Sequence, residues 1–173
     1  SKITEFAKIP KKKSKFVGVL VNPTDEEITK FNHPCLDYFQ LHGEEDIDRI
    51  KEIKLLSTKK IIKTIKINSE KDLALYNDYE KIVDIFLFDS KGYELSREFD
   101  HSLLKNIDKR SNKWMIAGNI KIEDLESIPK IADYVDVSGS LETNKKKDKK
   151  KIKDFLIKIK EINDENKKRQ TSN

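Results

Sequence analysis

The stretch VDIFLFDSKG (residues 83–92) is a nearly continuous apolar run that ends at one carboxylate, Asp89, and continues into small and polar residues. Apolar runs without polar alternation are typical of parallel strands that are covered on both faces. Further runs rich in Val, Ile and Phe occur on either side of it. We therefore predict six strands, at residues 16–21, 37–41, 60–67, 83–89, 113–118 and 134–138.

Helical patterns lie between these predicted strands. Thr24 followed by Glu27 is a capping box, Ser69 with Asp72 marks a second helix start, and Asp148 opens the last helix. Pro129 is expected near the end of the helix that precedes the last strand. The apolar residues at helical spacing are Ile47, Ile50, Ile53 and Leu56; Leu73, Leu75 and Tyr76; Leu103, Leu104 and Ile107; Ile122, Leu125, Ile128 and Ile131; and Ile152, Phe155, Leu156 and Ile159.

The alternation of strand and helix predicts repeated βαβ units, which build either an open doubly wound sheet or a closed barrel. In an open sheet only the strands beside the switch point need ligand-binding groups, whereas in a barrel every strand end opens on the same mouth. Polar or small residues lie at or just after the carboxyl end of all six predicted strands, which favours an α/β fold of the (β/α)8 TIM-barrel type. These residues are Asn22, Gln40, His42, Lys66, Asn68, Asp89, Gly118, Asn119, Asp136 and Ser138.

The strand count falls short of a complete barrel, which has eight strands in about 250 residues. The chain has 173 residues, begins at Ser1, and has its only methionine, Met115, in the interior. We expect the first one-and-a-half to two βα units to be absent, so that about six of eight are present. Residues 1–162 are then a single incomplete barrel domain, and residues 163–173 a polar C-terminal tail.

Composition narrows the classes of partner. The net charge of +5 comes mainly from lysine, with few arginines, whereas a nucleic-acid surface favours arginine with interleaved aromatic residues. No apolar run approaches the roughly twenty residues that span a bilayer, and no signal-peptide pattern opens the chain. The single cysteine, Cys35, cannot form an internal disulfide and fits a reducing compartment. We expect a cytoplasmic protein without nucleic-acid or membrane partners.

The residues alone leave the chemistry open. A histidine at a strand end, such as His42, is more often structural than catalytic. Asp89 either caps the next turn or, flanked by apolar surface, serves as a general acid. Small residues after the last two strands, at 117–119 and 137–140, let backbone N–H groups approach a phosphate, although ordinary tight turns use the same residues.

Seven segments, taken in order, resemble the phosphoribosylanthranilate isomerase family of barrel enzymes over nearly the whole chain. They are FVGVLVN (16–22) beside the family's VGVFVN, FQLHGE (39–44) beside VQLHG-(D/E), FDSK (88–91) beside LLD-(S/T)-K, FDHSLL (99–104) beside FDW-x-L-L, AGNI (117–120) beside AGGL, VDVSGSLE (135–142) beside VDVSSGVE, and KKD (146–148) beside GKKD.

This resemblance implies an Amadori rearrangement of N-(5-phosphoribosyl)anthranilate to 1-(2-carboxyphenylamino)-1-deoxyribulose 5-phosphate, a step of tryptophan biosynthesis. Asp89 matches the family's general acid, which protonates the ribose ring oxygen. Asp136 matches the aspartate that holds the anthranilate amine. Gln40 and His42 match positions that line the mouth of the barrel.

The resemblance also implies a phosphate cradle formed by backbone groups of Gly118, Asn119, Ser138, Gly139 and Ser140. It implies no metal and no organic cofactor. The expected ligand is a small phosphorylated substrate, and the expected assembly is a monomer or a homodimer.

The chain departs from the family pattern at several positions. The family's base is a cysteine in a K-x-C-G segment at the end of the first strand, and no segment here matches it. Cys35 precedes its strand, so we expect it at the wrong end of the barrel. The basic residue that the family presents after its second strand also has no match. Without the base, we expect this chain alone to be poorly active.

Two glycine positions of the family are changed as well. Residues 91–98 replace a GG-(S/T)-GK loop, and Lys91 or Arg97 is a candidate for its positive charge. Asn119 replaces a glycine, which is expected to narrow the approach of the backbone to phosphate.

Two rival functions remain. The first is a non-catalytic sugar-phosphate-binding barrel derived from the same family. The second is a nucleic-acid or acidic-partner module that acts through the lysines of residues 145–160. We prefer to read that lysine run as the solvated outer face of the last helix, because the apolar face of the helix is intact.

Overall fold

A computed structural model describes residues 2–67, 69–90, 103–104 and 112–171. The six predicted strands form one parallel sheet whose strand order follows the chain, β1-β2-β3-β4-β5-β6. The strands are β1 (Val17–Leu20), β2 (Tyr38–Leu41), β3 (Lys60–Ile67), β4 (Ile85–Ser90), β5 (Lys113–Ile116) and β6 (Tyr134–Val135). A doubly wound sheet would reverse its strand order at a switch point, and this sheet does not.

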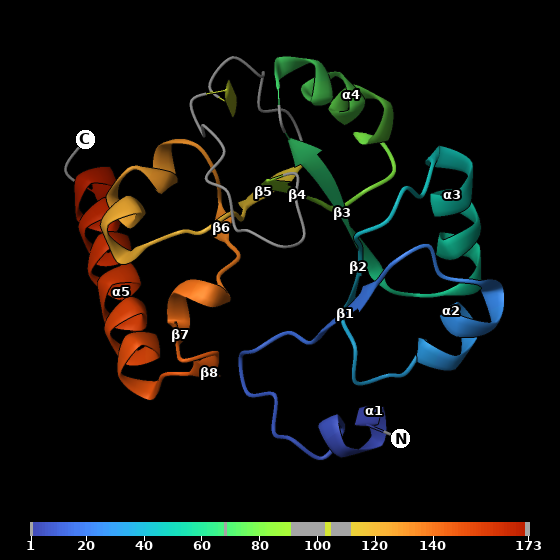
Figure 1. Cartoon of the computed structure of the whole chain (residues 1–173), viewed down its shortest axis with the longest axis horizontal. Helices are drawn as coiled ribbons and strands as arrows, with labels where there is room; N and C mark the ends of the chain where they lie inside the picture. Colours follow the sequence, from blue (N-terminus) through green and yellow to red (C-terminus); the bar gives the residue numbers. More distant parts are fainter. Residues whose placement is uncertain (1, 68, 91–102, 105–111, 172–173) are drawn as a thin grey trace.

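Helices lie around the periphery of the sheet (Figure 1). They are α1 (Lys2–Phe6), α2 (Asp25–Phe31), α3 (Ile47–Leu56), α4 (Leu75–Tyr79) and α5 (Lys149–Thr171), with the 3₁₀ turns η1 (Glu70–Ala74), η3 (Ile122–Glu126), η4 (Ile128–Lys130) and η5 (Gly139–Leu141). A small hairpin of β7 (Glu142–Thr143) and β8 (Lys146–Lys147) precedes α5. Sequential parallel strands with helices outside them make this a partial (β/α)8 barrel, as the sequence predicted.

The capping residues predicted at the starts of α2 and α5 are confirmed. The Thr24 side chain accepts a hydrogen bond from Glu27 N, and the Glu27 carboxylate accepts one from Thr24 N. Asp148 accepts hydrogen bonds from the backbone N–H groups of Lys150 and Lys151 at the start of α5. These side chains satisfy donors that the first helical turn leaves without intrahelical partners.

The segment before β6 differs from the sequence prediction. We expected one helix from Ile122 to Ile131, and the structure has the two short turns η3 and η4. Pro129 lies inside η4, where its ring nitrogen has no hydrogen to donate to a preceding carbonyl. The start at Ser69 and Asp72 likewise leads into the 3₁₀ turn η1 before α4. The predicted helix over Leu103, Leu104 and Ile107 falls largely outside the described residues.

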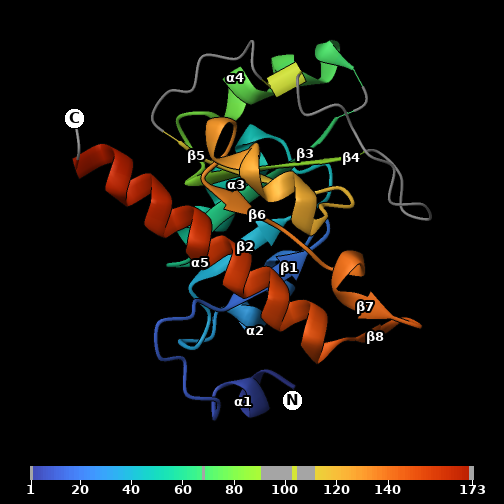
Figure 2. The same cartoon turned by 90° about the vertical axis from the view of Figure 1, so that its left-hand side faces the viewer.

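The buried face of the last helix differs from the predicted one at a single residue. Phe155 is buried and Ile159 and Ile162 pack against the core, whereas Leu156 is 60% exposed. Positions 155, 159 and 162 share one stripe at helical spacing, and position 156 lies about 100° away from position 155. The helix continues through residues 163–171, so these polar residues are helical (Figure 2). No helix among the described residues is long and apolar enough to cross a membrane.

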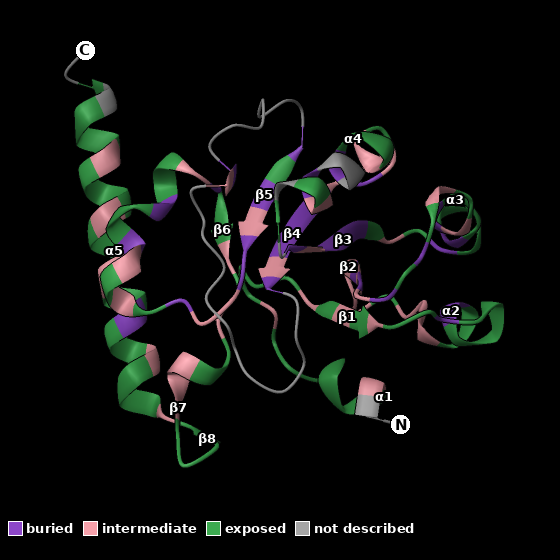
Figure 3. Ribbon diagram, turned by 45° about the horizontal axis from the view of Figure 1, so that its top comes forward, coloured by how far each residue is buried: buried purple, intermediate pink, exposed green. Residues whose placement is uncertain are grey.

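The sheet is buried on both faces at its centre, which explains the continuous apolar character of its strands. Ile61 and Ile65 of β3 pack towards the helices, and Ile62 joins Ile85 and Leu87 on the inner face. Burial is concentrated in β3 and β4 (Figure 3). The edge strands differ, since β1 and β6 carry exposed residues and each pairs with one neighbour among the described strands.

Candidate active site

Asp89 lies near the carboxyl end of β4, on the face that Ile85 and Leu87 turn to the barrel interior. One carboxylate oxygen, Oδ1, accepts the backbone N–H of Ser90 at 2.8 Å. The other, Oδ2, lies 4.0 Å from Nε2 of His42. One oxygen of Asp89 is therefore bonded within β4, and the second lies on the side of His42.

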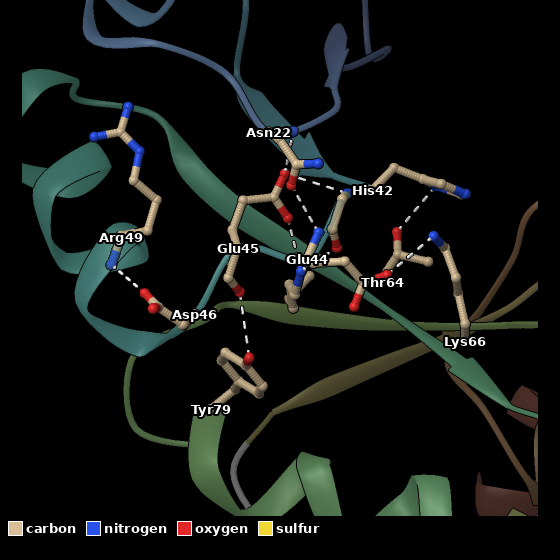
Figure 4. A network of polar contacts seen from close by, with 11 residues as sticks. Asn22, His42, Glu44, Glu45, Asp46, Arg49, Thr64, Lys66 and Tyr79 are labelled. Carbon is tan, nitrogen blue, oxygen red and sulfur yellow. Dashed lines mark hydrogen bonds and ion pairs between the residues drawn. The ribbon is translucent and has the colours of Figure 1, made fainter.

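His42 follows β2 directly, and its own N–H donates to the carbonyl of Leu20 at the end of β1. Its Nδ1 lies 3.2 Å from the hydroxyl of Thr64 (Figure 4). The donor and acceptor of this contact depend on which ring nitrogen carries the proton: with the proton on Nε2, towards Asp89, the Thr64 hydroxyl donates to Nδ1. The ring thus lies between a hydroxyl from the interior of β3 and the predicted acid.

Gln40 lies two residues before His42 and therefore faces the same side of the sheet. It is half-buried, with Val19 and Ile62 as its neighbours in register. It lies one layer deeper in the barrel interior than His42. Neither Gln40 nor His42 lines the cavity described next.

A cavity of about 170 Å³ opens at the carboxyl ends of β4, β5 and β6. Seven of the nine predicted site residues line it, so the structure brings together the end of β4 and the loops after β5 and β6, which are distant in the sequence. Its lining consists of Asp89, Ser90, Ala117, Gly118, Asn119, Ile120, Asp136, Val137, Ser138, Gly139 and Ser140.

The turn after β5, which lines the cavity, has a left-handed backbone conformation. Gly118 has φ = 93° and Asn119 has φ = 48°, both in the left-handed region. Asparagine is, after glycine, among the residues that tolerate this region best, so the replacement of a family glycine by Asn119 preserves the turn. In the next loop the Ser140 hydroxyl is buried and has no hydrogen-bond partner among the described residues. A polar ligand in the cavity would satisfy it.

Asp136 lies just beyond β6, and its N–H donates to the carbonyl of Ile116 at 2.8 Å. Desolvation in the concave mouth raises the pKa of Asp136, and the charge of Asp89 raises it further, while His42 and Lys147 oppose the shift. By its accessible area the residue is nevertheless exposed to solvent. Two carboxyl groups therefore share one cavity, and the charge of one disfavours the ionisation of the other, Asp136.

Sequence reasoning did not single out several residues that organise this region. Lys63 and Glu45 form a buried ion pair, with 2.7 Å between Nζ and Oε2. Lys147 donates from Nζ to the carbonyl and the hydroxyl of Ser138 at 3.0 and 2.9 Å. The available signal for Lys63 was its position inside the apolar run of residues 60–67.

Some predictions fall elsewhere or cannot be placed. Cys35 lies in the connection between α2 and β2, at the amino end of the sheet and away from the mouth, as expected. Lys91, Arg97, Asn68 and residues 99–102 lie outside the described residues. Within the part of the chain that the structure describes, no group of three His, Cys, Asp or Glu side chains is arranged to hold a metal ion.

The fold and the cavity define a class. Parallel strands in barrel order, with carboxylates and small-residue loops at their carboxyl ends, are the ligand-binding mouth of a (β/α)8-barrel protein. A sequence model of N-(5'-phosphoribosyl)anthranilate isomerase matches residues 2–158. The chain belongs to this family.

Relatives and solved structures agree with that placement. The N-(5'-phosphoribosyl)anthranilate isomerases of Bacillus cereus strains G9842 and ATCC 14579 are 37% and 38% identical over 153 residues, which cover 84% of this chain and 72% and 73% of theirs. The Thermotoga maritima phosphoribosyl anthranilate isomerase structure has a TM-score of 0.77 at 29% identity, over 90% of this chain and 77% of that one. A phosphoribosyl anthranilate isomerase in complex with reduced 1-(o-carboxyphenylamino)-1-deoxyribulose 5-phosphate has a TM-score of 0.74 at 28% identity. The match covers 90% of this chain and 75% of that one.

Proposed function

We propose that the chain provides the acid and phosphate-binding part of a phosphoribosylanthranilate isomerase. This enzyme converts N-(5-phosphoribosyl)anthranilate into 1-(2-carboxyphenylamino)-1-deoxyribulose 5-phosphate in tryptophan biosynthesis. The observation that carries the proposal is the cavity that gathers Asp89, Asp136 and the loops after β5 and β6, in a chain of this family.

Asp89 is the general acid. Its free oxygen delivers a proton to the furanose ring oxygen as the bond from that oxygen to C1 breaks, which opens the ring to an iminium. Loss of the C2 proton then gives an enolamine, which takes up a proton at C1 and releases the proton of its C2 hydroxyl to become the 2-keto product. His42, 4.0 Å from Asp89, orients the carboxyl group and compensates the charge left on it.

Asp136 and the two loops hold the substrate. Asp136 accepts a hydrogen bond from the anthranilate amine. Backbone N–H groups of Gly118, Asn119 and residues 138–140 bind the phosphate, and the Ser140 hydroxyl has a buried position without another described partner. Gln40 and His42 line the adjoining wall of the mouth. The described residues on this wall offer hydrogen bonds and carboxylates, which suits a reaction of proton transfers.

The base that removes the C2 proton is not matched within residues 1–173. Among the described strands β1 and β6 each pair with one neighbour, and we propose that residues 1–162 form one domain that one-and-a-half to two further βα units complete. This chain alone then has low turnover, since loss of a general base typically costs about 10²–10⁴-fold. Joining a strand with a K-x-C-G segment upstream of Ser1 restores the rate. Near-complete activity of the unextended chain would contradict this part.

Asp89→Asn separates the enzyme from a non-catalytic sugar-phosphate binder. In the extended chain we expect turnover to fall by about 10²–10⁴-fold, with little change in affinity for the reduced product analogue. Asp48→Asn, on the exposed surface of α3, is the matched control and leaves both unchanged. A binder would show the same affinities and no turnover in any variant, the parent included.

Location and assembly are the remaining parts of the proposal. The free cysteine Cys35 fits a reducing compartment, and we place the protein in the cytoplasm. Its assembly is a monomer or a homodimer, which sedimentation analysis distinguishes.

A further inference from the structure

A buried ion pair lies behind the mouth, on the helix-facing side of β3. Lys63 Nζ is 2.7 Å from Glu45 Oε2 and donates to the carbonyl of Gly43 at 2.8 Å. The two side chains are 4% and 1% exposed. Removing two charges from water costs about as much as their attraction returns, so such a pair is better suited to selecting one conformation than to adding stability.

The same carboxylate ties two loops together (Figure 4). Glu45 Oε1 accepts the N–H of Asn22 at 2.8 Å and that of Gly43 at 3.2 Å. The Asn22 side chain returns a contact, since its Oδ1 accepts the N–H of Glu44 at 2.8 Å. The turns after β1 and β2 and the interior of β3 are therefore joined through one buried carboxylate.

Electrostatics support an ionised pair at this position. Burial raises the pKa of Glu45, but the hydrogen bond and charge of Lys63 and the N–H of Asn22 outweigh it and bring the pKa below its ordinary value. Glu45 is thus an anion that can accept hydrogen bonds from all of these donors at neutral pH.

The link to the mouth is made by neighbouring residues of one strand. Lys63 and Thr64 point to opposite faces of β3, as successive residues of a strand do. Lys63 holds Gly43 from the helix side, and Thr64 contacts His42 from the mouth side. Strand β3 therefore holds the His42–Gly43 turn from both sides, and His42 faces Asp89 at 4.0 Å.

We propose that the Lys63–Glu45 pair is a positioning device, which fixes the turn after β2 so that His42 keeps one tautomer and one distance from Asp89. It acts through His42 and does not touch the substrate. The expected effect on ligand binding rests on the proposed function. The expected effect on the His42 tautomer does not depend on that function.

The test is Lys63→Met/Glu45→Gln, which removes both charges and keeps an acceptor for the two backbone N–H groups. Two quantities are measured on the chain extended upstream of Ser1 by the K-x-C-G strand, in the parent and in each variant. The first is the tautomer of His42 from the ¹⁵N shifts of its ring, and the second is the affinity for reduced 1-(o-carboxyphenylamino)-1-deoxyribulose 5-phosphate. Lys51→Met, an exposed lysine of α3 whose carboxylate partner is also exposed, is the matched control.

In the parent chain and in Lys51→Met we expect a single His42 tautomer with the proton on Nε2. In the double variant the ring exchanges between tautomers, and the affinity falls roughly 2- to 30-fold. A folded double variant with an unchanged His42 spectrum overturns the proposal. Failure of the parent chain to bind the analogue, with the His42 change intact, refutes the proposed function and leaves the positioning role supported.

A second variant covers the case in which the double variant does not fold. Asn22→Gly removes the acceptor for Glu44 N–H without burying a charge, and glycine suits the φ of 46° at this position. We expect the same loss of a single His42 tautomer, in a smaller fraction of molecules. Glu45→Gln alone breaks the ion pair and keeps an acceptor for both backbone N–H groups, and a folded Glu45→Gln chain with the parent spectrum also overturns the proposal.

Discussion

Gly43→Ala tests whether the turn after β2 is packed as tightly as the positioning role requires. A Cβ at this position would lie against the Oδ1 of Asn22, 2.6 Å from its Cγ and 2.7 Å from its backbone nitrogen. Distances below 3.0 Å are essentially never seen for real Cβ atoms. Asn22 cannot move aside freely, because its N–H is bonded to Glu45 and its Oδ1 accepts from Glu44.

The expected cost follows from these contacts. Overpacking a tight site costs about 1–3 kcal/mol, and each displaced hydrogen bond adds about 1 kcal/mol. We expect a loss of about 2–4 kcal/mol from the free energy of unfolding, a large part of the roughly 5–15 kcal/mol that a domain has. With a urea m-value of about 2 kcal/mol/M, the unfolding midpoint falls by about 1–2 M.

Urea denaturation followed by circular dichroism measures this shift. Gly139→Ala is the matched control, since a Cβ there has no heavy atom within 4 Å. That variant should be neutral or more stable by up to about 1 kcal/mol, because alanine restricts the unfolded chain. The double variant Asn22→Gly/Gly43→Ala should recover part of the loss, as two of the three close atoms are removed. Equal midpoints for Gly43→Ala and Gly139→Ala would refute the packing argument.

Two further predictions concern titration. Hydrogen bonds from Lys11 and then from the N–H of Phe16 lower the pKa of Asp37 from 3.8 to about 2. The contribution of Asp37 to the free energy of unfolding is therefore present above its ordinary pKa and is lost as the pH falls from about 4 to about 2. In Asp37→Asn the free energy of unfolding should change less across that pH interval. The same pH dependence in the variant and the parent would count against the contact between Asp37 and Lys11. For Asp136, whose pKa is raised by desolvation and then by Asp89, the sign is opposite, because the folded state disfavours its charge as the pH rises. Asp136→Asn should melt at a higher temperature than the parent at neutral pH, with the difference vanishing below pH 3.8, while affinity for the product analogue falls; a lower melting temperature at neutral pH would contradict this reasoning.

Most residues of the candidate site could be predicted from the ends of the expected strands and from the segments that resemble the family. Asp89, Asp136 and the loops at 117–119 and 137–140 were found because they follow apolar strands, and parallel strands bring their carboxyl ends to one edge. The cavity gathers them, and its chemical roles remain proposals. His42 was weighed as structural or catalytic, and only its distances to Thr64 and Asp89 show that it links the two.

Residues with a non-local environment were not predicted. Lys63 lies in an apolar run, where sequence alone does not show which charge compensates it. Its partner Glu45 lies 18 positions away and was assigned no role. The single helix expected over residues 122–131 failed for a local reason, since Pro129 interrupts the hydrogen-bond ladder.

The sequence by itself determined the alternation of strands and helices, the capping of α2 and α5, and the kinds of side chain at the strand ends. These depend on periodicity and on contacts within a few residues. Only the tertiary structure decided that the strands pair in chain order, that a buried lysine and glutamate join two turns, and that His42 faces Asp89. Such features depend on which strands become neighbours, and that choice is made by packing across the whole sheet.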